Sequence, residues 1–286
     1  MLSIRLLLPL FLVMILFTTM TLPARAQPVL TFGVHPFLPA TELHKRFQPL
    51  IKHLTHIMKR PVRLHVASTY AEHIDNVGNQ LVDIAFLGPS PYVKIVKKYG
   101  PPKLLAQLRV KGKDTFHGVI FTYQAATIVK LEQLKGKRMA FGDVNSTMSH
   151  LVPLHMLEKV GVSKVDLASH QHVQNHVNVI YGVLTGLFDA GAAKESVYKR
   201  YAHWGLRVLE KSSAIPNHVI VARSNLPEEV IAEVKKALAL LKPKTMDAQL
   251  LKALKPGITG LGVVSDKAFD GLRHILNISI PKRGVE

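Results

Sequence analysis

The segment 142–149, Gly-Asp-Val-Asn-Ser-Thr-Met-Ser, carries the residues best suited to hold an anion. It follows a short apolar run at 138–141 and precedes a helical pattern at 151–160, which predicts a strand, a polar turn and a helix start. The first N–H groups of a helix have no intrahelical acceptor and carry partial positive charge, so they favour an anion. Ser146 and Thr147 would add hydroxyl donors at the same point. The alternative is an ordinary helix cap, because Asn, Ser and Thr are the usual capping residues.

Alternating strands and helices must position this segment. Apolar runs predict strands at 29–34, 61–66, 82–87, 104–110, 119–123, 138–141, 190–193, 206–209 and 219–222. Periodic apolar positions predict helices at 41–58, 70–81, 92–99, 151–160, 173–184 and 227–241. This alternation predicts parallel sheets with helices on both faces, in which ligands bind at loops beyond the carboxyl ends of strands. The candidate loops are 35–41, 67–71, 88–92, 142–149 and 170–176.

The first 26 residues have the layout of a secretory signal peptide. Arg5 precedes an apolar run at 6–17, and Ala24-Arg25-Ala26 is a small-x-small cleavage pattern. We expect cleavage after residue 26, and the alternative is a retained membrane anchor. No later apolar run has the length of a membrane span, and the chain contains no Cys to form a disulfide or carry a lipid. The mature chain is therefore expected to be free in the periplasm.

Charge and motif content exclude several classes of function. The chain has 37 Lys and Arg against 19 Asp and Glu, a balance that favours anionic partners. These basic residues are scattered without a recognition motif, so a nucleic-acid partner is not expected. An enzyme is not expected either, because Cys is absent, Ser146 lacks a Gly-x-Ser-x-Gly elbow, and neither a Walker loop nor paired carboxylates occur. We expect no cofactor.

Several short motifs follow one another along the mature chain. They are TFGVHP at 31–36, ASTY at 67–70, VDIAFLGPSPY at 82–92, LKGK at 134–137, DVNST at 143–147, NHV at 175–177, GLFDAG at 186–191 and IPN at 215–217. In order and spacing they resemble the phosphate/phosphite/phosphonate-binding proteins of ABC importers. The resemblance implies two Rossmann-like α/β lobes joined by two crossover strands, the type II periplasmic binding protein fold. It places the first lobe at 27–118 and 223–286 and the second lobe at 119–222.

The resemblance also implies a set of ligand-binding residues on both lobes. From the first lobe, Tyr70 and Tyr92 would donate phenolic O–H groups, and the alternative for both is core packing with a satisfied hydroxyl. From the second lobe, the hydroxyls at 146–147, the N–H groups of 147–149 and an imidazole at the start of a helix would bind the anion. The full set is Tyr70, Ser90, Tyr92, Ser146, Thr147, Met148 and His176.

Some positions depart from the family pattern. Met148 stands where a small residue is usual and can offer only its backbone N–H, and Ser149 stands where Gly is usual. His218 occupies a position where an Asp often holds an ammonium group, which favours a simple anion over an aminoalkylphosphonate. Glu195 lies near a second acidic position of the family. The sequence leaves open whether Glu195 or His218 faces the ligand.

These observations predict a monomeric periplasmic solute-binding protein for phosphate, phosphite or a simple phosphonate. It would capture the oxyanion between its lobes and deliver it unchanged to an ABC permease in the inner membrane. One alternative is a sensory protein that reports the ligand to a membrane histidine kinase. Another is a metal-binding importer subunit, because His170, His172 and His176 form a His-x-His-x-x-x-His pattern. No Asp or Glu completes this cluster, so we expect no resident metal.

Overall fold

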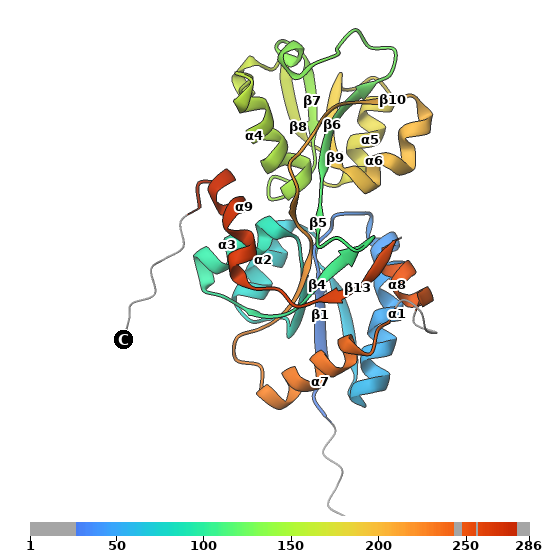
Figure 1. The fold of residues 1–286 in the computed structure, drawn as a ribbon, viewed down its shortest axis with the longest axis vertical. Coiled ribbons are helices and arrows are strands. Elements are labelled where there is room, and N and C mark those ends of the chain that lie inside the picture. The colour runs from blue at the N-terminus through green and yellow to red at the C-terminus, as the bar shows by residue number, and fades with distance from the viewer. Residues whose placement is uncertain (1–26, 243–247, 256, 279–286) are drawn as a thin grey trace, which may run out of the picture.

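Two α/β lobes lie one above the other in the structure, a computed structural model that describes residues 27–242, 248–255 and 257–278 (Figure 1). The sheet of the first lobe has the strand order β13-β4-β12-β3-β1-β2, and the sheet of the second has the order β10-β6-β9-β7-β8. The first lobe is built from both the early and the late parts of the chain, as the blue and red ends of the colour scale show in Figure 1. The expected signal peptide at 1–26 lies outside the described residues.

The first lobe combines a mixed sheet with helices on both faces. Its strands are β1 (Leu30–Val34), β2 (Val62–Val66), β3 (Ile84–Leu87), β4 (Lys103–Val110), β12 (Val219–Ala222) and β13 (Ile258–Gly262). Its helices are α1 (Ala40–Met58), α2 (Tyr70–Gly78), α3 (Pro89–Tyr99), α7 (Glu228–Ala239), α8 (Ala248–Leu254) and α9 (Asp270–Ile275), the last preceded by a 3₁₀ turn at Asp266–Phe269. Strands β2, β1 and β3 are parallel, whereas β12 is antiparallel to both of its neighbours.

The second lobe has the same layered construction. Its strands are β6 (Gly118–Tyr123), β7 (Arg138–Phe141), β8 (Ser169–His172), β9 (Ala190–Lys194) and β10 (Leu206–Lys211). Its helices are α4 (Val152–Lys159), α5 (His176–Leu184) and α6 (Glu195–Tyr201), with 3₁₀ turns at Leu131–Leu134, Lys164–Asp166 and Ala202–Trp204. Strand β7 is parallel to β8 and β9, and β6 is antiparallel to β9 and β10. The prediction of parallel sheets is therefore wrong for both lobes, because each sheet also contains antiparallel strand pairs.

Two chain segments connect the lobes and lie side by side. Strands β5 (Thr115–Phe116) and β11 (Ile215–Pro216) pair antiparallel as the chain leaves the first lobe and returns to it. The expected boundary at 222 is placed too late, because β12 already belongs to the first sheet. A paired two-strand connection is a natural hinge, since small backbone rotations there move one lobe against the other.

Most predicted helices and strands are present, and three boundaries differ for local reasons. Helix α3 begins at Pro89, three residues before the predicted start, because Pro suits the first turn of a helix. Helix α5 begins only at His176, because the Asn175 side chain caps it by accepting from the N–H of Val177 at 3.0 Å. Residues 173–175, predicted to be helical, instead form the bend that connects strand β8 to this helix. A π-helical turn at Thr147–Leu151 leads into α4, which places Pro153 in the first turn of that helix.

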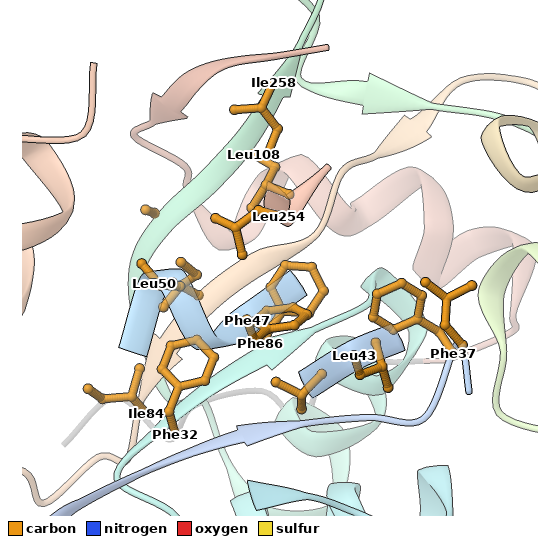
Figure 2. Close-up of a cluster of buried hydrophobic side chains, with 14 of the residues drawn as sticks. Phe32, Phe37, Leu43, Phe47, Leu50, Ile84, Phe86, Leu108, Leu254 and Ile258 are labelled. Carbon is orange, nitrogen blue, oxygen red and sulfur yellow. The ribbon is translucent and has the colours of Figure 1, made fainter. Parts of the chain in front are cut away.

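An aromatic and aliphatic core fixes the carboxyl ends of β1 and β3. On the amphipathic helix α1, Leu43, Phe47 and Leu50 recur at helical spacing and are buried. The ring of Phe47 packs edge-on against that of Phe86 with centroids 5.0 Å apart, and both are drawn in Figure 2. Because β3 ends one residue after Phe86, this packing also fixes the loop that follows the strand. None of the described helices is both long and apolar enough to cross a bilayer.

Candidate functional site

A small pocket lies between the two lobes, at the carboxyl ends of their strands. It is lined by His35, Tyr70, Gly88, Phe116, Ser146, Thr147, Met148, His176, Lys194 and His218. Two of these follow first-lobe strands directly: His35 comes after β1 and Gly88 after β3. Second-lobe residues reach the same space from the loops after β7 and β8. The alternation of elements predicted this placement, because ligand loops of α/β sheets gather where strands end.

The helix start at 146–151 presents donors to the pocket. The Ser146 hydroxyl accepts from the N–H of Ser149 at 3.3 Å and so caps the π-helical turn. The N–H groups of Thr147 and Met148 have no intrahelical acceptor, as at any helix start, and both residues line the pocket. The Ser149 hydroxyl accepts from the N–H of Gly142 at 2.9 Å and donates to the carbonyl of Ala192. The expectation of three free N–H groups at 147–149 is thus corrected to two, because the cap uses the third.

Three buried histidines surround the pocket, and their hydrogen bonds determine their tautomers. His35 Nδ1 lies 3.1 Å from the Phe86 carbonyl and His218 Nδ1 lies 3.3 Å from Asn217 Oδ1, so both nitrogens carry protons. His176 Nδ1 instead accepts from the backbone N–H of Lys194 at 3.3 Å. Neutral His176 therefore carries its proton on Nε2 and can donate to an anion. The other two rings can donate from Nε2 only after they gain a second proton.

The electrostatics of the pocket favour a negatively charged ligand. Burial lowers the pKa of His35, His176 and His218, that of His176 to about 3, and the ammonium of Lys194 lowers all three further. All three imidazoles are therefore neutral at pH 7. Within the described ranges, no Asp or Glu lines the pocket. A site lined by hydrogen-bond donors and a basic group, without an acidic side chain among its described lining residues, suits an oxyanion.

Tyr70 contributes a neutral donor from the first lobe. Its ring contacts that of His35 edge-on with centroids 4.7 Å apart, and its hydroxyl is hydrogen-bonded to the side chain of Ser146 on the second lobe. Burial raises the pKa of Tyr70, so the phenol stays protonated. A neutral phenol next to the helix start can donate to a bound anion.

Ser90 holds the two lobes together instead of lining the pocket. Its N–H donates to Thr147 Oγ1 at 3.0 Å, and its hydroxyl donates to the carbonyl of Asn145 at 2.6 Å. One turn later on α3, Lys94 Nζ donates to Asn145 Oδ1 at 2.6 Å. The segment 145–147 is therefore docked on α3, and the lobes are closed around the pocket.

Tyr92 lies outside the pocket, so its expected role as a donor in the cleft is wrong in this structure. Its hydroxyl donates to Asp266 Oδ1 at 2.7 Å, and its ring packs on Phe269 with centroids 4.5 Å apart. The fourth position of α3 faces the turn before α9, so the side chain is buried in the first lobe. Core packing with a satisfied hydroxyl, the alternative stated for this residue, is what the structure shows.

Sequence reasoning assigned no ligand role to several lining residues. His35 and Gly88 belong to loops that strand order had marked, whereas Lys194 ends a buried strand, where no sequence signal distinguishes it from a solvated lysine. The fold also answers whether His218 or Glu195 faces the ligand. His218 lines the pocket, and Glu195 is paired outside it with lysines on α6 and β10 at 2.7 and 3.1 Å.

The histidine pattern at 170–176 does not converge on one point. His170 and His172 lie exposed on β8, and the ring of His172 contacts that of His150 with centroids 4.6 Å apart. His176 points into the interlobe pocket from the start of α5. In the part of the chain that the structure describes, no group of three or more His, Cys, Asp or Glu can hold a metal. The three histidines of this pattern therefore do not form a common ligand set.

Comparisons with known proteins agree with this geometry. A family model described as ABC transporter, phosphonate, periplasmic substrate-binding protein matches residues 32–269. The phosphate-import protein PhnD of Mycolicibacterium smegmatis is 25% identical over 285 residues, covering 87% of this chain and 85% of that protein.

Two solved structures share the fold. One is a binding-protein component of an ABC phosphonate transporter from Pseudomonas aeruginosa, with a TM-score of 0.80, 21% identity, and 87% of this chain and 85% of that chain covered. The other is PhnD1 from Prochlorococcus marinus in complex with methylphosphonate, with a TM-score of 0.80, 21% identity, and 88% and 99% covered. Because the family model spans most of its length, the chain belongs to the periplasmic phosphonate-type substrate-binding proteins of ABC transporters, a non-enzymatic family with the two-lobed type II fold.

Proposed function

We propose that this protein captures a small phosphorus oxyanion, phosphate, phosphite or a simple phosphonate, in the pocket between its lobes. The observation that carries the proposal is the composition of the pocket, in which hydrogen-bond donors from both lobes meet without an acidic side chain among the described lining residues. Tyr70 would donate from the first lobe, and from the second lobe Ser146 would donate through its hydroxyl, Thr147 through its backbone N–H and His176 through Nε2. A relative named as a phosphate importer and a fold neighbour bound to methylphosphonate support this ligand class.

The pocket would favour an anion over water for two reasons. Hydrogen bonds to a charged acceptor contribute roughly 1.5–3 kcal/mol each, about twice a neutral bond. The donors are also fixed before binding, because a capped helix start and buried rings do not need to be ordered by the ligand. The same lining would disfavour a ligand with an ammonium group, which would find a cation instead of a carboxylate next to it.

Transport would follow from closure. An anion that bridges Tyr70 and the helix start at 146–148 makes more contacts in the closed form than in any open form, so it shifts the population towards closure. The closed protein would deliver its ligand to an ABC permease, which separates the lobes and releases the ligand. A cleaved segment at 1–26, a periplasmic location and a monomeric state complete the proposal.

Isothermal titration against phosphate, phosphite, methylphosphonate, sulfate and arsenite tests this assignment. We expect at least one phosphorus oxyanion to bind with one site per chain and a dissociation constant of about 1 µM or below. Absence of binding to every phosphorus oxyanion, in protein shown to be folded by circular dichroism, would overturn the proposal. A stoichiometric metal retained after dialysis would also overturn it, because the ligand would then be of another class.

A further inference from the structure

Lys194 and Lys255 place two buried amino groups next to each other between the lobes. Lys194 ends β9 of the second lobe and is 5% exposed, while Lys255 follows α8 of the first lobe and is 8% exposed. Their side chains are hydrogen-bonded to each other, so one of the two nitrogens must accept as a neutral amine, because an ammonium group has no acceptor. No acidic group in the described part of the chain acts on either of them. The two basic groups thus face each other across the cleft without a counter-charge from the described residues.

Contacts with aromatic rings offset only part of the cost of burying these two basic groups. Lys194 Nζ lies 4.8 Å from the ring centre of Phe116 and 5.6 Å from that of Phe37, and Lys255 Nζ lies 5.8 Å from that of Phe116. Cation–π attraction is weak beside the cost of removing an ammonium group from water. Burial accordingly lowers the pKa of both lysines, that of Lys255 to about 8. An anion bridging both nitrogens would restore the charged state of each.

The other basic groups at this end of the cleft are already paired or more exposed. Glu42, the acidic residue of α1, binds Arg46 at a side-chain nitrogen and Arg200 of α6 at 2.8 Å. Lys199 is paired with Glu195 at 2.7 Å and its side chain is 68% exposed. The buried lysine pair is therefore distinct from these solvated ion pairs.

A larger cavity extends from the lysine pair and is mainly apolar. Phe37, Phe47, Phe86, Leu108 and Leu254 line it together with both lysines, and Figure 2 shows how these apolar side chains converge from the loop after β1 and from α1, β3, β4 and α8. Its volume is about 350 Å³, against about 10 Å³ for the oxyanion pocket in this closed form. Lys194 lines both spaces and so marks their junction. There is room for more than a bare oxyanion, and the extra room suits hydrocarbon.

We propose that Lys194 and Lys255 bind a second anionic group of the ligand, which is a phosphonate or phosphate ester with an acid at the far end of a short apolar arm. An ω-carboxyalkylphosphonate is the simplest member of this class. The inference rests on the proposed function, because the first anionic group is the oxyanion held by the helix start at 146–148. Since the two lysines come from opposite lobes, the second anion would also stabilise closure.

Matched ligands test the second anion separately from the first. Titration at pH 7 compares methylphosphonate, three ω-carboxyalkylphosphonates with two to four carbons in total, ethyl-, propyl- and butylphosphonate, and 2-aminoethylphosphonate. We expect the best ω-carboxylate to bind at least about tenfold more tightly than the alkylphosphonate of equal length, and 2-aminoethylphosphonate to bind more weakly than ethylphosphonate.

Variants of the cavity lysines test whether the lysine pair causes the tighter binding of the ω-carboxylate. In Lys255→Met the advantage of the ω-carboxylate should fall to about twofold or less, while methylphosphonate affinity stays within about twofold, because this residue does not line the oxyanion pocket. Lys199→Met, which removes an exposed cation from the same cavity, should keep the advantage. Without ligand, the melting temperature of Lys255→Met should be unchanged or higher, since a buried unpaired charge is removed.

Two outcomes overturn the inference while leaving the proposed function intact. One is that methylphosphonate binds and no ω-carboxylate binds more tightly than its alkyl counterpart. The other is that the advantage persists in Lys255→Met. If neither methylphosphonate nor any other phosphorus oxyanion binds, the proposed function itself fails, and the inference fails with it.

Discussion

Ser90 of the first lobe and Thr147 of the second exchange hydrogen bonds across the cleft. The Ser90 N–H donates to Thr147 Oγ1 at 3.0 Å, and the Thr147 hydroxyl donates to Ser90 Oγ at the same distance. Thr147 is also the first residue of the helical turn that faces the pocket. The residue expected to bind the oxyanion therefore also joins the lobes, which couples binding to closure. The following predictions test this coupling and the site around it.

Removal of both hydroxyls at the helix start should abolish most of the affinity. In Ser146→Ala/Thr147→Ala, the loss of the Ser146 bond to a charged acceptor and of the Thr147 bonds to Ser90 across the cleft predicts a roughly 10–10³-fold rise in the dissociation constant for the bound phosphorus oxyanion. Because Ser146 is an N-cap, stability should also fall by about 1 kcal/mol. Ser163→Ala is the control, since it removes the hydroxyl of another helix-start serine, which donates to Asp166 and does not line the pocket. Titration that shows affinity within twofold of wild type would remove the helix start from the site.

Weakening the contacts between the lobes should speed ligand release. Ser90→Ala/Lys94→Met removes the bonds from α3 to Asn145, and we expect dissociation to accelerate about tenfold, equivalent to about 1.4 kcal/mol. Stopped-flow fluorescence with dyes on introduced cysteines at exposed Lys52 and Lys159 can follow opening, because the chain has no Cys of its own.

Lys98→Met is the control for this variant, since Lys98 lies on the same helix but pairs with Asp75 within the first lobe. An unchanged release rate in the double variant, with the control also unchanged, would show that these contacts do not hold the closed state.

Binding should take up protons. In the unliganded protein burial keeps the pKa of His35 and His218 well below the usual value, and a bound anion would raise it by favouring the imidazolium. The complex then binds more protons than the free protein, so affinity should increase as pH falls from 8 towards 6. Titration in buffers of different ionisation enthalpy measures this uptake. His35→Gln/His218→Gln should take up fewer protons, and equal uptake would assign the protons to the ligand alone.

Tyr92 should matter for stability and not for ligand affinity. Tyr92→Phe removes the bond from the phenol to Asp266, which predicts a loss of about 1–2 kcal/mol in the free energy of unfolding. Urea unfolding measures this loss, and titration should give a dissociation constant within about twofold of wild type. A tenfold loss of affinity at unchanged stability would instead return Tyr92 to the ligand site.

Acid should destabilise the unliganded protein through its buried histidines. His73 is fully buried, and burial lowers its pKa to about 4, whereas the unfolded chain titrates near 6.5. The unfolded state thus binds more protons, so this contribution is present above pH 6.5 and is lost as pH falls towards 4, by up to about 3 kcal/mol. The slope of unfolding free energy against pH should be shallower in His73→Gln. Equal slopes in both proteins would show that other groups dominate.

Local sequence determined those parts of the site that depend on neighbours along the chain. The helix start at 146–151 was predictable because Ser146 caps a turn a few residues ahead, so the capping residue and the N–H group that it binds lie in one short segment. Alternating elements placed His35 and Gly88 in ligand loops, because strand ends in such a sheet share one edge. The motifs that resemble the family predicted the two-lobed fold, and they did so by their order along the chain.

Only the tertiary structure decided which way distant side chains face. Tyr92 meets Asp266, which is 174 residues away, and nothing near Tyr92 in the chain signals that α9 covers it. Lys194 and Lys255 come from different lobes, so their encounter exists only when the cleft is closed. Hydrogen-bond caps and periodicity act over a few residues and are readable in sequence. Burial and charge pairing depend on which segments fold against each other, and this packing brings the two lysines together in the cleft.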